Sequence, residues 1–234
     1  HTHGTPNPET SILKPEYSKN FERKLKNNIK LTFNKAIYVK KIKVEIFYQR
    51  TKAAGISINR RKEALKFSPT LSYEMQNLPN ANAKTDDNLD LLDFVNIKNK
   101  KVECSIVKFS CHPVSAIAGK KGSDYVGYLK KSLKQKTANV YFLQGFCGDI
   151  RPKSIKKNLK LKDKVIKLLI GDRFRKAEQG DDKKIGLFLA NKIININEKK
   201  SKRINGTVNF ASHNYKIKLE KNLYLQKELS ITTW

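Results

Sequence analysis

Two hydrophobic periodicities alternate along this chain, and they constrain its fold more than any other feature of the sequence. In residues 15–36 apolar side chains recur every fourth position, whereas residues 37–49 alternate apolar side chains with other residues. The first pattern predicts a helix and the second a strand. Strands that alternate with helices predict an α/β fold, a layered domain with a mixed β-sheet flanked by helices. Similar patterns predict further strands at 89–96, 101–111, 140–144 and 204–219, and helices at 124–136 and 183–197.

Three segments interrupt these patterns and are predicted to lack regular structure. Residues 55–61 contain a glycine and the basic run Asn59-Arg60-Arg61, which predicts an exposed turn. Residues 66–88 contain two prolines, several asparagines and a pair of aspartates, which predict a long loop. Residues 171–184 are rich in Lys, Asp and Gly and are predicted to form a solvated loop. Loops as long as the second are usually functional or disordered.

The charge of the chain is strongly positive, with a formal net charge of +28 over 234 residues. Nucleic acid, an anionic membrane surface and an acidic glycan are the first partners to consider for such a chain. However, 41 of the 49 basic residues are lysine and eight are arginine, whereas nucleic-acid readers rely on arginine for bidentate contacts. The sequence therefore disfavours nucleic acid and predicts a solvated lysine surface, with an anionic membrane surface left open as a partner.

The three cysteines do not form a disulfide framework. None belongs to a Cys-x-x-Cys pair, and Cys104 and Cys111 lie on one predicted strand, too far apart to bridge without a turn. We therefore expect free thiols. The sequence contains no recognisable signal peptide and no initiating methionine, so we expect a processed or incomplete chain.

Histidine is scarce, and three of the four histidines fall in two short motifs. His1 and His3 belong to His-Thr-His-Gly, and His112 belongs to Ser-Cys-His-Pro. In an extended strand the side chains at i and i+2 share a face, so His1 and His3 would point the same way. With His112 delivered from a separate strand end, they would form a cluster of neutral nitrogens suited to Zn²⁺. The alternative is a frayed terminus and a histidine that lies beside a turn.

Five short motifs follow one another in a recognisable order. Residues 1–6 read HTHGTP, residues 58–61 INRR, residues 109–113 FSCHP, residues 123–128 SDYVGY and residues 148–152 GDIRP. They resemble, in the same order, motifs of the amino-terminal catalytic domain of the neutral/alkaline (non-lysosomal) ceramidase family: HTHSGP, an Asn-Arg turn, a strand ending in His-Pro, SDxxGY and GDVSP. Five ordered motifs are far more specific than any one of them alone.

The resemblance implies a zinc-dependent amidase that cleaves the N-acyl bond of a ceramide-like lipid or of another N-acylated small molecule. His1 and His112 match the family's zinc-binding histidines, and His3 matches the histidine that assists beside the metal by hydrogen bonding. Arg60 matches the arginine expected near the reacting group. Bound zinc would polarise the amide carbonyl and make hydroxide available at neutral pH.

Two aspartates also fall within the matching motifs. The resemblance implies that Asp124 and Asp149 orient histidines or cap turns around the metal. The alternative for both is plain turn chemistry, and Asp124, directly before a predicted helix, suits an N-cap. Asp149 follows a predicted strand and is flanked by glycine, a common way to deliver a side chain to a site.

One position departs from the family pattern, because Arg151 stands where the family has an active-site serine. Arginine does not replace a hydroxyl in shape or chemistry. It could instead bind an anionic group of the substrate, such as a carboxylate, sulfate or phosphate. A role for Arg151 in the active site would therefore count against a standard ceramide substrate.

The resemblance chiefly covers residues 1–152. It implies a single catalytic domain over residues 1–234 that is incomplete at both ends, since the family completes its zinc site with a Glu and a Tyr from later segments. It also implies a secreted, periplasmic or membrane-associated protein. Two other functions stay open: a catalytically degenerate member of the family, and a basic polyanion-binding protein that needs no metal, whose binding would weaken steeply with salt.

Overall fold

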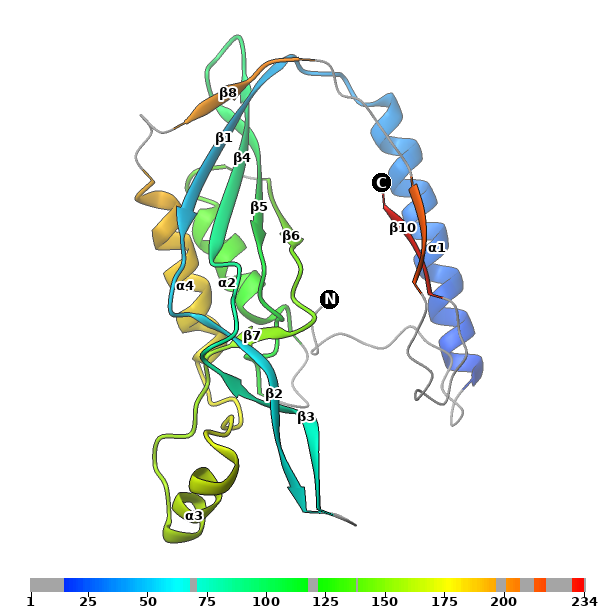
Figure 1. Ribbon diagram of the computed structural model, residues 1–234. Coiled ribbons are helices and arrows are strands. Elements are labelled where there is room, and N and C mark those ends of the chain that lie inside the picture. The colour runs from blue at the N-terminus through cyan, green and yellow to red at the C-terminus, as the bar shows by residue number, and fades with distance from the viewer. Residues whose placement is uncertain are drawn as a thin grey trace. The chain divides into compact units, whose positions relative to one another are not determined.

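The computed structural model describes residues 15–67, 71–117, 122–137, 139–196, 201–206, 213–217 and 229–233. The chain divides into two units, residues 1–203 and residues 204–234. Strands and helices mix in the first unit, so the predicted α/β class is confirmed (Figure 1).

A five-stranded sheet forms the main part of the first unit, in the order β6-β5-β4-β1-β8. β1 pairs with β4, and β4 with β5, in antiparallel fashion, whereas β5 and β6 run parallel. The sheet is therefore mixed, as predicted. Parallel neighbours need a crossover connection, and helix α2 supplies it between β5 and β6. The elements are β1 (Val44–Lys52), β4 (Asn88–Asn96), β5 (Val102–Phe109), α2 (Asp124–Leu133), β6 (Val140–Gln144) and β8 (Lys202–Ile204).

The hydrophobic core lies between this sheet and two helices, α2 and α4 (Asp181–Ile194). Leu91 and Phe109 of the sheet are fully buried in one cluster with Leu129 of α2 and Leu189 of α4. Apolar residues at helical spacing on α4, such as Ile185, Leu189 and Ile193, turn one face of that helix to the core. The two helices thus cover one face of the sheet (Figure 1).

Close packing of α2 against α4 depends on Gly186. A Cβ at this position would lie 2.6 Å from the carbonyl oxygen of Tyr125 and 2.9 Å from the amide nitrogen of Leu129, both backbone atoms of α2. We expect Gly186→Ala to lower the free energy of unfolding by about 1–3 kcal/mol, because the helices must separate to admit the methyl group. Urea denaturation measures this loss. Gly148→Ala is the control, since its Cβ would meet nothing within 4 Å; an equal loss in both variants would contradict the packing argument.

A three-stranded sheet, in the order β3-β2-β7, contains the INRR motif and the end of the GDIRP motif. β2 (Ser57–Phe67) pairs antiparallel with β3 (Leu71–Asn80) and with the short β7 (Ile150–Pro152). The loop predicted for residues 66–88 is therefore wrong over 71–80, where backbone pairing with β2 outweighs the low strand propensity of asparagine and proline. The predicted turn at 55–61 is also too long, because β2 begins at Ser57 and buries Asn59.

The predicted helix at 15–36 is confirmed as α1 (Pro15–Tyr38). The strand predicted over residues 37–49 begins later than expected, as β1 at Val44, because the helix continues to Tyr38. Apolar side chains that recur every fourth residue in α1, Leu25, Ile29 and Phe33, are 41%, 60% and 66% exposed. Helix α3 (Leu161–Ile170) lies in a region for which the sequence patterns predicted no element. Among the described residues, no helix is both long enough and apolar enough to cross a membrane. In the second unit, β9 (His213–Ile217) pairs antiparallel with β10 (Leu229–Thr233).

Candidate functional site

Two of the matching motifs meet where the parallel strands β5 and β6 end. Parallel neighbours end at the same edge of a sheet, so the segments that follow them, residues 110–113 and 145–149, emerge side by side. The backbone N–H of His112 donates to the carbonyl oxygen of Ile150 at 3.0 Å. This bond fixes His112 against β7, nearly forty residues further along the chain.

The imidazole of His112 lies against Cys147. Its Nδ1 is 3.4 Å from the carbonyl oxygen of Cys147 and 3.6 Å from the Cys147 thiol sulfur. The Gln144 side-chain amide also donates to that sulfur. All three cysteines are free, as predicted, but Cys147 is a site residue that the sequence reasoning missed. The sequence offered only a weak signal for it, its position in a glycine-flanked turn after β6, without the paired spacing that indicates a ligand.

Arg60 reaches the same turn from the three-stranded sheet. Its backbone N–H donates to the carbonyl oxygen of Asp149 at 2.7 Å, and its guanidinium Nε and Nη2 donate to the carbonyl oxygen of Gly148 at 3.1 and 2.7 Å. The Asn59 amide donates to the Asp149 carboxylate at 2.6 Å. Asp149 therefore orients the Asn59 side chain of β2.

Arg151 lies on β7, opposite Ile58 of β2. Its guanidinium carbon is 4.2 Å from the ring centroid of Phe174, a cation–π distance. Its Nε is buried and has no hydrogen-bond partner among the described residues. Burial, together with the positive charge of Arg60, lowers the pKa of the Arg151 guanidinium. Arg151 thus joins Arg60 beside the segment that carries His112.

Asp124 holds the segment that follows His112 and Pro113. Its carboxylate accepts hydrogen bonds from the backbone N–H of Ser115 and of Ala116, at 2.8 and 2.7 Å, and from the Ser115 hydroxyl. It also accepts the backbone N–H of Tyr125 at 2.7 Å. Asp124 has φ 54°, a left-handed conformation that aspartate enters more readily than most residues. Its carboxylate therefore ties a loop to the start of α2 and does more than cap the helix.

A second network anchors the segment before His112. Lys108 and the hydroxyl of Ser110 both donate to the same carboxylate oxygen of Asp86, at 2.7 and 2.8 Å. Burial opposes ionisation of Asp86, but these two hydrogen bonds, a third from the Asn88 N–H and the positive charge of Lys108 together hold the pKa of the carboxyl well below its usual range. The chain is thus fixed on both sides of the Cys111-His112-Pro113 segment.

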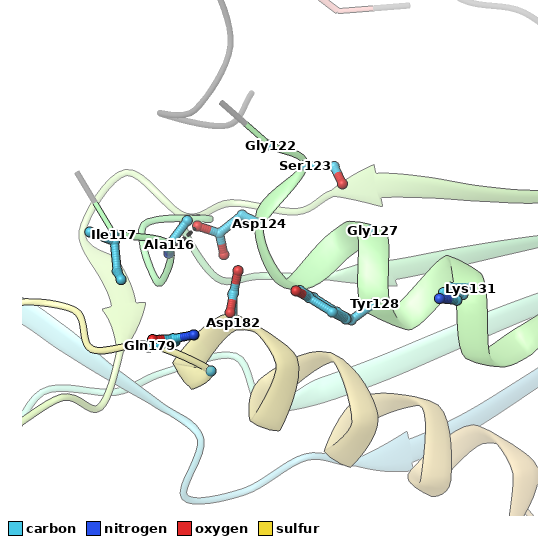
Figure 2. A pocket seen from close by; sticks show the side chains of 11 residues that line it. Ala116, Ile117, Gly122, Ser123, Asp124, Gly127, Tyr128, Lys131, Gln179 and Asp182 are labelled. Carbon is cyan, nitrogen blue, oxygen red and sulfur yellow. Dashed lines mark hydrogen bonds between the residues drawn. The ribbon is translucent and has the colours of Figure 1, made fainter. Parts of the chain in front are cut away.

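A pocket of about 410 Å³ lies beside this segment, between the first turns of α2 and α4. Figure 2 shows Asp124 of α2 and Asp182 of α4 on facing sides of it, with Ala116 and Ile117 at one end. Within the part of the chain that the structure describes, its lining includes Asp124 but neither His112 nor an arginine. The groups able to carry chemistry gather at the strand ends, so we place the candidate site there and not in this pocket.

His112 and Cys147 are the metal-donor side chains that the structure brings together at the strand ends. His1 and His3 lie outside the described residues, and among the described residues no three His, Cys, Asp or Glu side chains cluster as metal ligands do. Tetrahedral zinc, with bonds of about 2.0–2.1 Å to nitrogen and about 2.3 Å to sulfur, sets those two donors roughly 3.6 Å apart. His112 Nδ1 and Cys147 Sγ have this separation. In the tautomer that leaves Nδ1 unprotonated, and so not donating to the Cys147 carbonyl, these two atoms could occupy one edge of a zinc site.

Comparisons with known proteins give one distant likeness. No protein-family model matches the chain, and no curated protein matches it. Among solved structures, the crystal structure of neutral ceramidase from Pseudomonas aeruginosa is similar to this chain with 21% sequence identity and a TM-score of 0.42. The match covers 65% of this chain and 22% of that one, so the chain spans less than a quarter of the length of that protein.

Proposed function

We propose that the chain carries the metal-binding part of a zinc-dependent amide hydrolase that cleaves the N-acyl bond of a lipid or other N-acylated molecule. The observation that supports this proposal is that four of the five ceramidase-like motifs converge through hydrogen bonds. His112 bonds to the GDIRP segment, Arg60 bonds to the same segment, and Asp124 of the SDYVGY motif holds the residues after His112. These contacts bring segments up to ninety residues apart in the sequence to one place in the fold.

The ligands that we assign to zinc are His112 and Cys147, with His1 as a further ligand and His3 beside the metal. Imidazole and thiolate are both common zinc donors. When bound, zinc would polarise an amide carbonyl and lower the pKa of a coordinated water toward neutrality. Cys147 extends the ligand set that the family resemblance implies, because it supplies a donor that the sequence motifs did not suggest.

The other residues would position the reacting groups. The hydrogen bond from the His112 N–H to Ile150 and the bonds that Asp124 accepts restrict the backbone on both sides of the imidazole. Arg60 uses Nε and Nη2 to bind Gly148 and makes no hydrogen bond to a described residue through Nη1. That donor could stabilise the oxyanion that develops when an amide carbonyl is attacked.

Metal content tests this proposal directly. We expect the purified chain to retain about one zinc ion, to lose it to a chelator together with its hydrolysis of N-acyl substrates, and to regain both on adding zinc. With cobalt in place of zinc, we expect a thiolate-to-cobalt charge-transfer absorption band. That band should vanish in Cys147→Ser and persist in Cys104→Ser, a matched control on β5.

The possible outcomes separate the parts of the proposal. A folded chain that takes up neither zinc nor cobalt would overturn it and favour the catalytically degenerate reading. Metal uptake without the charge-transfer band would remove Cys147 from the ligand set and leave the histidine ligands standing. Hydrolysis that survives complete removal of the metal would overturn zinc dependence.

A further inference from the structure

Arg151 differs from the partly buried Arg173 and Arg175 because it makes no ion pair with a carboxylate among the described residues. Arg173 pairs with Asp163 and Arg175 with Asp181, at 2.8 and 2.7 Å. Arg151 has no ion pair with a described residue, and its buried Nε has no hydrogen-bond partner there. Arg151 is half-buried, and a polar atom that is shut off from water without a partner is costly, so native proteins usually compensate it.

The surroundings of Arg151 hold its guanidinium in place without neutralising it. The ring of Phe174 covers one face at 4.2 Å, and strand pairing with Ile58 fixes the backbone. Arg60, whose positive charge acts on Arg151, adds a second cation near it. A guanidinium that is stacked on a ring and unpaired at its edge is pre-organised for a planar, bidentate oxyanion.

We propose that Arg151 binds an oxyanion of the substrate, a carboxylate or a phosphate, so that the preferred substrates are anionic N-acyl compounds and not neutral ceramides. This inference rests on the proposed function only where it calls the bound molecule a substrate. The anion would supply a countercharge that no described residue gives Arg151, and Arg60 would strengthen the attraction. The acyl amide of the same molecule would then lie near His112, whose segment bonds to β7 beside Arg151.

Binding measured by calorimetry tests the anion site without requiring catalysis. The probes are N-hexanoylglycine, N-hexanoyl-phosphoethanolamine and the neutral N-hexanoylethanolamine, which share one acyl chain. Because a charge-assisted hydrogen bond contributes more than a neutral one, we expect at least one anionic probe to bind about 10- to 100-fold more tightly than the neutral probe. The stronger of the two anionic probes identifies carboxylate or phosphate as the preferred group.

Variants separate this site from general attraction to a basic surface. We expect Arg151→Gln to reduce the preference to within about twofold, and Arg23→Gln, which removes an equal charge from exposed α1, to retain it. Arg151→Lys keeps the positive charge but loses the planar guanidinium that donates two parallel hydrogen bonds, so it should retain only part of the preference for anionic probes. Measurement at raised salt suppresses nonspecific attraction to the lysine-rich surface.

Three results would overturn the inference: equal binding of all three probes by the wild-type chain, a preference that Arg23→Gln abolishes equally, or a preference that survives in Arg151→Gln. The first needs no variant, so the test holds even if the substitutions unfold the chain. Hydrolysis is scored separately on zinc-loaded protein. Anion-selective binding without hydrolysis would overturn the proposed function alone, whereas hydrolysis of the probes together with equal binding of all three would overturn only the anion site.

Discussion

Replacing His112 by alanine is expected to remove the bound zinc and, with it, hydrolysis of N-acyl substrates. Loss of a residue that only supports a metal ligand typically weakens metal affinity 10–100-fold, so loss of the ligand itself should cost at least about 100-fold. The fold should survive, because the bond that ties this segment to Ile150 comes from the backbone N–H, which alanine keeps. Zinc per chain, measured by elemental analysis, and the rate of hydrolysis are the two readouts.

His213 provides the matched control for this experiment. It lies in β9, in the second unit and outside both histidine motifs. His213→Ala should keep its zinc and its activity. Zinc content in His112→Ala equal to that of the wild type would show that His112 is not a ligand. Equal losses in both variants would point to general destabilisation and not to the metal site.

Replacing Asp124 by alanine is expected to give the largest loss of stability of any single change considered. The carboxylate satisfies the backbone N–H groups of Ser115 and Tyr125, both of them residues that are almost completely buried. Each buried donor left without a partner costs about 1–3 kcal/mol, and alanine also tolerates a positive φ less well than aspartate. We expect the free energy of unfolding to fall by about 3–5 kcal/mol, measured by urea denaturation with an unchanged m-value.

Asp182 offers a control of the same residue type in the same pocket. Its carboxylate accepts one hydrogen bond, from the backbone N–H of Lys183, among those that the structure describes. Asp182→Ala should therefore cost less than about 1 kcal/mol. Asp124→Asn should fall between the two, since the amide keeps one acceptor oxygen. A loss in Asp124→Ala no larger than that in Asp182→Ala would contradict the assigned role of Asp124.

Much of the architecture could be predicted where the local pattern and the tertiary environment agree. Strand β6 begins and ends where the sequence pattern predicted, because a short apolar run that stops at a glycine fits a strand, here the edge strand of the sheet. Strand β3 was missed, since Asn77, Pro79 and Asn80 are poor strand formers and only pairing with β2 stabilises them there. Helix α3 gave no signal strong enough to predict.

The candidate site was predictable in part, and the roles of its residues stay predictions. The motifs identified His112, Arg60, Arg151 and Asp149, and the structure places them around one turn. They did not identify Cys147, because a single cysteine between glycines has no spacing that indicates a ligand. His1 and His3 lie outside the described residues, so their approach to His112 stays an expectation.

By itself, the sequence determined the α/β class, the order of the main strands and helices, and the residue types available for zinc and anion chemistry. Those properties follow from hydrophobic periodicity and local motifs, which act over a few residues. Only the tertiary structure decided that Asp124 restrains the chain beyond His112, that Asp149 binds Asn59, and that Arg151 has no carboxylate partner among the described residues. Partners in these contacts lie up to ninety residues apart, and strand pairing, which local sequence encodes weakly, sets which of them meet.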